Sequence, residues 1–423
     1  MRASTQAQAV EALLARNPPA VTEAFLTVER DRSFDFGETN PTSRTTPESF
    51  AHIALPNIQH GISPDEAVLS LYLGTQSSCL WAVTQEGFEF HRLAAPTQLA
   101  ALAHEFRNAV ESNSPHRDVL GQRLYRELFG ELSAGVRRKP QWLVIADDTL
   151  FDVPFPTLVA GNQKGNPVYL VEEHSTQRIS SALTLVQPVH RAARGAFLGI
   201  GDGIYNTADP RWTSRHGRIS SELRDSTFQL TRLPASGTEL ASSAREWRGN
   251  TNVLLTGLGA SSASFQASLK MRPRVIHIAA HVIQPDGNAG QALIYLGLSE
   301  NGRPQTLTQN EIAKLNVSGS TVVMSGCSSA GLQSVEGAAI LGLTRAWLLA
   351  GARAVVGSRW ATPDDTGELF QVFYRDLRDR CDRGADGRVI GASLQQAQQA
   401  MLRSSTWRSN PSYWGALYAV GKE

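Results

Sequence analysis

Cysteine is scarce in this chain of 423 residues, which contains three, Cys79, Cys327 and Cys381. They form no CxxC pair, and an odd number cannot all be paired within one chain. Disulfide frameworks are typical of small secreted domains, and structural zinc sites need closely spaced cysteine or histidine ligands. We therefore expect three free thiols in a reducing compartment, with no disulfide framework and no metal.

The chain also lacks an excess of charge and a long hydrophobic run. It has 40 Lys and Arg against 39 Asp and Glu, a formal net charge of +1. Such a balance provides no general attraction for nucleic acid or for an anionic membrane surface. No run reaches the length of a membrane span, and the start, MRASTQAQAV, has no apolar stretch of the signal-peptide kind. We expect a soluble, cytoplasmic protein that binds neither nucleic acid nor membrane.

Three common catalytic or cofactor motifs are missing. A GxSxG elbow, the mark of many serine hydrolases, does not occur. The glycine-rich run at 199–203 half-resembles a dinucleotide fingerprint, but the polar residues after it open no helix. His277 and His281 have the spacing of the zinc motif HExxH, yet Ile-Ala-Ala separates them in a segment that is typical of a strand. The sequence therefore predicts no cofactor.

The composition that is present is ordinary for a globular protein, with 41% hydrophobic and 19% charged residues. The length suggests two domains and an appendage. Apolar positions at helical spacing in residues 3–30 predict two helices broken at Pro18 and Pro19, and the polar residues 33–50 predict a linker. We divide the chain into an N-terminal helical segment with its linker (1–60), a first α/β half (61–193) and a second (194–423).

Both halves alternate strand and helix patterns, which predicts an α/β fold with a mostly parallel sheet and helices on both faces. Strands are expected at 67–74, 79–85, 87–93, 141–148, 168–171, 177–179, 195–203, 252–255, 275–280, 322–324, 352–360 and 413–420. Helices are expected at 97–112, 118–133, 236–247, 262–269, 336–349, 365–377 and 390–402. Residues 202–232 are polar and are expected to form a long surface loop.

A cysteine and a histidine follow two of these strands. Cys327 comes just after the apolar run 322–324, and His281 ends the strand expected at 275–280. The carboxyl ends of strands in open α/β sheets form ligand crevices. If the two strands are sheet neighbours, His281 can generate the reactive Cys327 thiolate. The pattern predicts the dyad of a cysteine hydrolase.

Each residue also has an ordinary structural explanation. A cysteine at a strand end is often a small buried hydrophobe, and a strand-end histidine often satisfies a nearby carbonyl. His277 is expected to be a packed neighbour. The first half has no Cys–His pair of its own: Cys79 is expected to be buried, and His91 and His104 to face solvent. We therefore interpret the first half as structural.

Several ordered motifs resemble those of the CHAT family, caspase-like cysteine peptidases related to separases. They are WLVIADDTLFDVPFPTLV (142–159), VYLVEEHSTQRISSALTL (168–185), VIHIAAH (275–281), VVMSGCSSAG (322–331), EGAAILGLTRAWLLAGARAVVGSRWATPDD (336–365), FYRDL (373–377) and PSYWGALYAVG (411–421). The resemblance spans about residues 65–421. It implies a caspase-like sandwich of mostly parallel sheet flanked by helices, in which the inactive half (61–193) precedes the active half (194–423).

The resemblance also implies a role for individual residues. It makes Cys327 the nucleophile and His281 the general base of an endopeptidase that forms an acyl-enzyme. The backbone N–H groups of Cys327 and Val282 would hold the oxyanion. The family usually has glycine where this chain has Val282, which puts the second oxyanion donor in question. The sequence does not identify a third catalytic residue beside these two.

Two aspartates, Asp364 and Asp365, follow the strand expected at 352–360. This exit lies beside the active site in the caspase fold, and separases place an acid here to hold a P1 arginine. The resemblance therefore implies a P1 pocket that favours a basic side chain. Two alternatives stay open: one aspartate caps the next helix, or Arg353 and Arg359 favour a P1 aspartate instead.

The resemblance further implies a setting and partners. The family often acts in bacterial immunity or regulated cell death, where a repeat or sensor protein switches it on and it cleaves a dedicated protein such as a bacterial gasdermin. No repeat array is visible here, so we expect a separate protein substrate or activator. Two other functions remain open: a catalytically weak scaffold or binding module with this fold, and another cysteine hydrolase, such as an amidase or a deubiquitinase-like enzyme.

Overall fold

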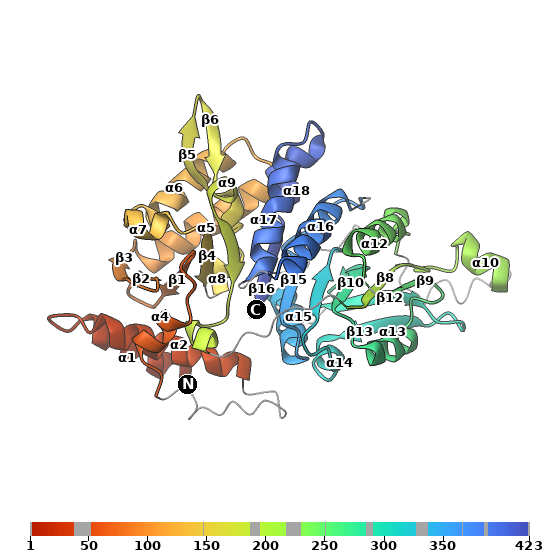
Figure 1. Ribbon diagram of the computed structural model, residues 1–423, viewed down its shortest axis with the longest axis horizontal. Coiled ribbons are helices and arrows are strands. Elements are labelled where there is room, and N and C mark those ends of the chain that lie inside the picture. The colour runs from red at the N-terminus through yellow and green to blue at the C-terminus, as the bar shows by residue number, and fades with distance from the viewer. Residues whose placement is uncertain are drawn as a thin grey trace. The chain divides into compact units, whose positions relative to one another are not determined.

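The chain folds into two compact units, shown in Figure 1. The first unit comprises Met1–His190 and Ile390–Glu423, and the second comprises Arg191–Val389. The computed structural model describes residues 2–37, 52–146, 148–186, 195–216, 230–249, 251–284, 291–326, 337–365, 367–384 and 388–421.

The first unit is built on a sheet with the strand order β3-β2-β1-β4-β7-β16. Its strands are β1 (Glu66–Leu73), β2 (Ser78–Val83), β3 (Phe88–Arg92), β4 (Gln141–Ile145), β7 (Ser175–Arg178) and β16 (Leu417–Gly421). The β1-β2-β3 meander is antiparallel, whereas β1, β4, β7 and β16 pair in parallel. A separate antiparallel pair is formed by β5 (Val159–Gln163) and β6 (Asn166–Tyr169).

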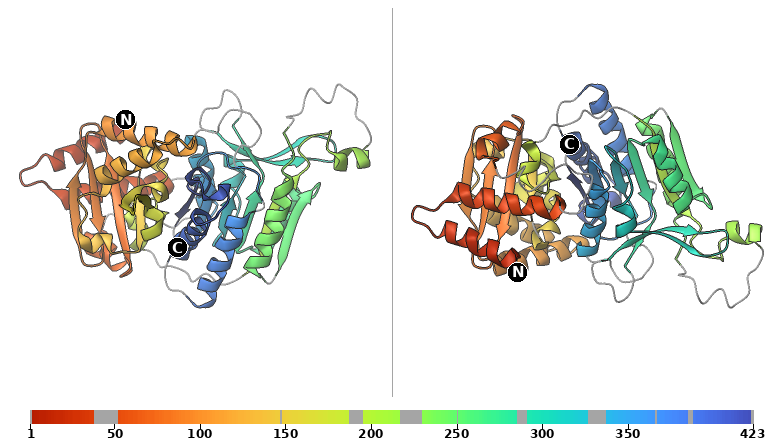
Figure 2. Two further views of the ribbon diagram at one scale, coloured as in Figure 1. Left: turned by 90° about the horizontal axis from the view of Figure 1, so that it is seen from above. Right: turned by 90° about the horizontal axis from the view of Figure 1, so that it is seen from below.

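Helices cover both faces of this sheet, because successive strand residues point to opposite faces and both sets are apolar. One face carries α1 (Arg2–Leu14) and α2 (Val21–Gly37), whose Phe25 packs on Trp81. The other carries α5 (Pro96–Glu111) and α6 (Arg117–Phe129), and Phe129 meets Trp142 there. Figure 2 shows the two pairs on opposite sides. The remaining helices are α4 (Leu55–His60), α7 (Ala134–Arg137), α8 (Asp148–Phe151), α9 (Leu170–Glu173), α17 (Val389–Leu402) and α18 (Pro411–Trp414).

A buried ion pair attaches α2 to this sheet. Arg32 Nη1 donates to Glu29 Oε1 at 2.9 Å, and both side chains are almost fully buried. Glu29 also accepts from the Ser70 hydroxyl of β1, at 2.7 Å, and from the backbone N–H of Ala182, at 2.6 Å. The N-terminal helices are therefore part of the first unit's core and do not form a segment apart from it.

The second unit has a parallel sheet with the strand order β15-β14-β10-β8-β9. Its strands are β8 (Phe197–Gly203), β9 (Asn252–Gly257), β10 (Val275–Ala279), β14 (Thr321–Met324) and β15 (Ala354–Ser358). Its helices are α10 (Pro210–His216), α12 (Pro234–Trp247), α13 (Ser262–Ser268), α14 (Gln309–Ile312), α15 (Gly337–Leu349) and α16 (Glu368–Asp382). Strands β10, β14 and β15 are buried along their whole length, as their apolar runs predict.

A small antiparallel sheet continues directly from β10. It consists of β11 (His281–Ile283), β12 (Leu293–Leu298) and β13 (Pro304–Thr308). The β12–β13 hairpin was not among the elements expected from the sequence. His281 begins β11, so the candidate base lies at the junction between the parallel sheet and this second sheet.

The structure confirms the α/β class and the mostly parallel sheet with flanking helices. It differs from the expectations in further elements as well. Residues 411–414 form α18 before the closing strand, and α10 lies within the expected loop 202–232. The C-terminal residues group with the first unit, because β16 pairs with β7 and Gln177 bonds Gly391 N and Gly421 O.

Among the residues that the structure describes, no helix has both the length and the apolar character needed to span a membrane.

Candidate active site

The two strands that lead to His281 and to Cys327 are direct neighbours, as the sequence analysis required. β10 and β14 pair in parallel, with Ile278 opposite Met324. Their contact continues past the strand ends, where Ser325 N donates to the carbonyl of Ile278 at 3.1 Å. Both strands therefore end at the same edge of the second unit's sheet.

The chain beyond β14 passes very close to the residue before His281. A Cβ atom added to Gly326 would lie 2.1 Å from the carbonyl oxygen of Ala280, so only glycine fits at this position. Gly326 and Ala280 each immediately precede a predicted dyad member. Cys327 itself lies outside the described residues.

His281 is held in one orientation. Its side chain is almost fully buried, and its Nε2 atom lies 2.8 Å from the carbonyl oxygen of Thr231. A carbonyl can only accept a hydrogen bond, so Nε2 carries the proton and the neutral ring keeps Nδ1 as its basic nitrogen. Tyr205 packs against the imidazole, with the ring centroids 4.6 Å apart.

The surroundings keep this imidazole neutral. Burial lowers the pKa of His281, and the hydrogen bond to the Thr231 carbonyl opposes that shift in part. A neutral imidazole at pH 7 can take a proton from a thiol, which is what a general base must do.

The chain from Leu230 to Ser236 holds the Thr231 carbonyl in place. Arg232 directly follows Thr231 in the chain. Its side chain makes two hydrogen bonds to the carboxylate of Asp202, at 2.9 and 3.1 Å. The backbone N–H of Asp202 donates to Ser236 Oγ at 2.9 Å, at the start of α12. Asp202 lies near the carboxyl end of β8, so a sheet strand fixes the segment that orients His281.

Asp364 lies at the same edge, beside α12. Its Oδ2 atom accepts a hydrogen bond from Ala235 N, at 3.1 Å. Partial burial of its carboxyl group raises the pKa of Asp364, and the nearby carboxylates of Glu239, Asp202 and Asp365 raise it further. Asp364 thus lies within a group of acidic side chains at the first turn of α12.

Asp365 is buried, with 9% of its surface exposed. The helix expected from residue 365 begins at Glu368, with Gly367 at its N-cap in the left-handed region at φ 75°. Gly367, as the N-cap residue, has no side chain with which to cap α16. The start expected at residue 365 is therefore wrong by three residues, because the positive φ of Gly367 interrupts the helical backbone.

Val282 occupies the position that the resemblance assigns to the second oxyanion donor. It lies in β11 opposite Ile294, is buried, and is not among the residues with positive φ. A β-branched residue fits a strand backbone well, so its presence causes no strain here. A role for its N–H group as an oxyanion donor stays a prediction.

The cysteine and the histidines considered in the first half of the sequence have ordinary structural surroundings. Cys79 is a free thiol, and burial raises its pKa far above the ordinary value. His104 is exposed as expected, whereas His91 is half-buried, with Nε2 3.1 Å from Glu89. In the part of the chain that the structure describes, no cluster of acidic, histidine or cysteine side chains could hold a metal ion.

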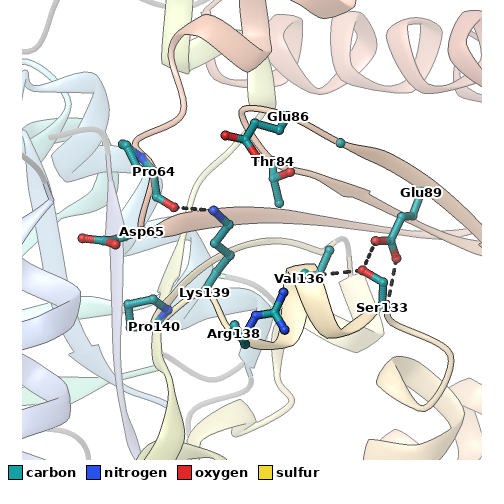
Figure 3. A pocket seen from close by; sticks show the side chains of 12 residues that line it. Pro64, Asp65, Thr84, Glu86, Glu89, Ser133, Val136, Arg138, Lys139 and Pro140 are labelled. Atoms are coloured by element: carbon teal, nitrogen blue, oxygen red, sulfur yellow. Dashed lines mark hydrogen bonds between the residues drawn. The ribbon is translucent and has the colours of Figure 1, made fainter.

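Two hollows lie elsewhere on the molecule. One in the first unit, of about 380 Å³, lies between the segments around Glu89 and Lys139, whose Nζ bonds Pro64 O at 2.5 Å (Figure 3). The other, of about 700 Å³, lies near the amino ends of β10 and β14 and is lined in part by Lys270 and Lys314. No described cysteine or histidine lines either of them.

The model of the CHAT domain family matches residues 118–422, which is more than half of the chain. The chain belongs to the CHAT family.

This CHAT protein also resembles single proteins over parts of their length. It is 31% identical over 123 residues to tetratricopeptide repeat protein 28 of Mus musculus, covering 29% of this chain and 5% of that protein. The Homo sapiens protein of that name is 30% identical over 118 residues, covering 28% and 4%. The CHAT protein thus spans about a twentieth of the length of these relatives.

Two solved structures are similar to the CHAT protein at 10% sequence identity. One is the Saccharomyces cerevisiae separase–securin complex, with a TM-score of 0.49 over 95% of this chain and 34% of the other. The second is the Arg-specific cysteine proteinase gingipain R, with a TM-score of 0.41 over 77% and 74% of the respective chains.

Proposed function

We propose that this CHAT protein is a cysteine endopeptidase whose dyad is His281 and Cys327. The observation that carries the proposal is the Nε2···O contact between His281 and Thr231, which leaves Nδ1 as the basic nitrogen. The contact of Gly326 with Ala280 supports it, since it brings together the chain positions that precede the two residues. Membership of the CHAT family agrees with both.

The reaction follows from ordinary thiol chemistry. His281 Nδ1 takes the proton of the Cys327 thiol, and the thiolate sulfur bonds to the carbonyl carbon of the scissile peptide. The backbone N–H groups of Cys327 and Val282 stabilise the oxyanion. As the C–N bond breaks, the imidazolium gives its proton to the leaving amine. His281 then deprotonates a water molecule, which hydrolyses the thioester and frees the acid product.

The test combines protein cleavage with alkylation of the cysteines by iodoacetamide, located by mass spectrometry. We expect fast alkylation of Cys327, its loss of rate in His281→Ala, and no cleavage by either His281→Ala or Cys327→Ala. Cys381→Ala is the matched control and keeps wild-type cleavage. Cleavage by Cys327→Ala would refute the dyad. A wild-type protein that neither cleaves nor reacts quickly would favour the scaffold function instead.

We further propose that the P1 pocket favours arginine or lysine and uses Asp364. This residue is exposed and has Asp202 and Glu239 near it, of which Asp202 is paired with Arg211 and Arg232. A charge-assisted hydrogen bond to a cationic side chain contributes roughly 1.5–3 kcal/mol. Asp365 is buried and is the weaker candidate. Arg353 precedes β15, at the opposite end of the strand, whereas the buried Arg359 follows β15 and stays the candidate for a P1 aspartate pocket.

The proposed partners are a dedicated protein substrate, such as a bacterial gasdermin, and a separate activating repeat or sensor protein in a bacterial defence or cell-death system. The two mammalian relatives are tetratricopeptide repeat proteins by name, which supports a repeat partner. We expect the purified chain alone to leave unrelated proteins intact. Rapid cleavage of casein or albumin by the chain alone would contradict this gating.

A further inference from the structure

A buried polar cluster lies at the strand ends of the second unit, apart from the His281 contacts. It joins Glu239 of α12, His277 of β10, Tyr374 of α16 and Ser325, which follows β14. His277 Nε2 lies 2.9 Å from Glu239 Oε1 and 3.1 Å from Ser325 Oγ, and Tyr374 Oη lies 3.1 Å from His277 Nδ1. The Ser325 hydroxyl donates a hydrogen bond to Glu239 Oε1.

The donors and acceptors of the cluster can be assigned from chemistry. The Glu239 carboxylate only accepts, so the Ser325 hydroxyl and His277 Nε2–H both point to it. His277 Nδ1 then accepts from the Tyr374 hydroxyl. Complete burial and the Glu239 charge hold the pKa of Tyr374 well above its usual value, so this hydroxyl keeps its proton. All four groups are satisfied in this arrangement.

Stability alone gives little reason for such a cluster. His277 and Tyr374 are fully buried and Glu239 nearly so, and aromatic rings such as Phe370 pack on His277. A carboxylate in such surroundings is costly, and apolar side chains of similar volume are often as stable or more stable there. A retained buried network is better explained by the geometry that it imposes.

That geometry concerns the approach to Cys327. Ser325 is two residues before the nucleophile, and its two bonds run to different elements. Its N–H donates to Ile278 O of β10, and its hydroxyl donates to Glu239 of α12. These bonds fix the backbone where β14 ends, one residue before the close contact of Gly326.

Glu239 is itself held from the opposite side. A Cβ atom added to Gly367 would lie 2.4 Å from Glu239 Cγ, and φ at Gly367 is 75°. The loop that carries Asp364 therefore packs on Glu239, while Glu239 bonds Ser325. The side chain of Glu239 thus contacts both the Ser325 side chain, two residues before the nucleophile, and the loop of the proposed P1 pocket.

We propose that Glu239 and His277 are positioning residues that act through Ser325 and place Cys327 relative to His281. The inference rests on the proposed endopeptidase activity. Displacement of a reacting group by about 1 Å can lower a rate about 100-fold. Loss of the Ser325 hydroxyl should therefore reduce the chemical step and leave substrate binding largely unchanged.

The experiment compares Ser325→Ala, Glu239→Gln and the double variant by kcat, KM and melting temperature on one cleaved substrate. We expect kcat of Ser325→Ala to fall about 10- to 100-fold, with KM within twofold. Because Glu239 acts through Ser325, the double variant should lose no more than Ser325→Ala alone. The rate of Cys327 alkylation should fall in parallel, and it remains measurable in a poorly active variant.

Ser320→Ala is the matched control. Ser320 is a buried serine at the amino end of the same β14 region, and its hydroxyl bonds Pro273 O at 2.5 Å. It should lower the melting temperature without lowering kcat. A kcat within twofold of wild type in Ser325→Ala, or multiplied losses in the double variant, overturns the positioning role alone. Absence of both cleavage and fast Cys327 alkylation in the wild-type protein overturns the endopeptidase and the positioning role together.

Discussion

His281 Nε2 lies 2.8 Å from the carbonyl oxygen of Thr231, fifty positions earlier in the chain. In the Ser-His-Asp triad a carboxylate bonds the imidazole nitrogen that is not the base, Nδ1; here a backbone carbonyl oxygen plays that part, at Nε2. It fixes the tautomer as a carboxylate would. It carries no charge, however, so it stabilises the imidazolium far less, and burial determines the direction of the pKa shift.

The first prediction concerns that shift. In Cys327→Ala, where no thiolate can interact with the ring, His281 should titrate below its ordinary value of 6.5 because burial disfavours the charged form. Nuclear magnetic resonance of ¹³C-labelled histidine measures the titration, and the signal missing from a Cys327→Ala/His281→Gln variant identifies the residue. A titration at or above 6.5 would contradict the prediction.

The same shift has a consequence for stability. Since the folded-state pKa of His281 is lower than the unfolded-state value of 6.5, the unfolded chain binds the proton more readily. The free energy of unfolding should therefore be unaffected by this residue above pH 6.5 and fall as the pH drops through the folded-state pKa. Urea unfolding from pH 7.5 to 5 should show a smaller decline in His281→Gln than in the wild type.

The second prediction concerns Gly326. Gly326→Ala would place a methyl group 2.1 Å from the Ala280 carbonyl oxygen, and backbone cannot yield as a flexible side chain can. We expect a loss of about 1–3 kcal/mol in the free energy of unfolding, together with loss of cleavage. Gly161→Ala is the control, since no atom lies within 4 Å of its added Cβ. Equal melting temperatures for the two variants would contradict the close contact.

The third prediction concerns P1 selectivity. Asp364→Asn keeps an oxygen that can accept from Ala235 N but removes the charge, so the protein should fold normally. The preference for P1 arginine over norleucine should fall about 10-fold or more, as loss of a charge-assisted bond of roughly 1.5–3 kcal/mol requires. Peptides differing only at P1 measure it, with Asp365→Asn in parallel. Cleavage after aspartate would reject the basic pocket. Cleavage after apolar residues that is the same in both variants as in the wild type would also reject it.

The fourth prediction concerns the buried pair in the first unit. Glu29→Ala leaves the buried Arg32 guanidinium without its carboxylate, and should lower the free energy of unfolding by about 3–5 kcal/mol. Glu23→Ala on the same helix removes an exposed pair with Arg16 and should lower it by less than about 1 kcal/mol. Urea denaturation measures both. Similar losses would show that the Glu29 pair does not anchor α2.

The sequence predicted the features that rest on apolar periodicity. The buried runs at 275–280 and 322–324 are too apolar for anything but central strands, and their order along the chain makes them plausible neighbours. Their parallel pairing is confirmed. The family motifs then selected His281 and Cys327 from ten histidines and three cysteines.

What the sequence did not reveal is mostly polar and non-local. Every residue has a backbone carbonyl, so the amino-acid sequence does not identify Thr231 as the partner of His281. Glu239 lies on an ordinary amphipathic helix, and its hydrogen-bond partner Ser325 comes 86 positions later in the chain. His277 was expected to be merely packed, because periodicity shows which face a residue occupies but not which polar groups meet it there.

The pairing of β1 with β4 shows that the start of the CHAT family match is not the start of the folded unit. The CHAT family model begins at residue 118, yet β4 lies between β7 and β1, with Ala67 opposite Trp142. A chain started at residue 118 would leave one edge of β4 unpaired and expose the apolar face that α1 and α2 cover. Such an edge readily pairs with another chain. The stretch that the family model matches is therefore shorter than the sheet of the first unit, and a fragment cut at residue 118 should self-associate.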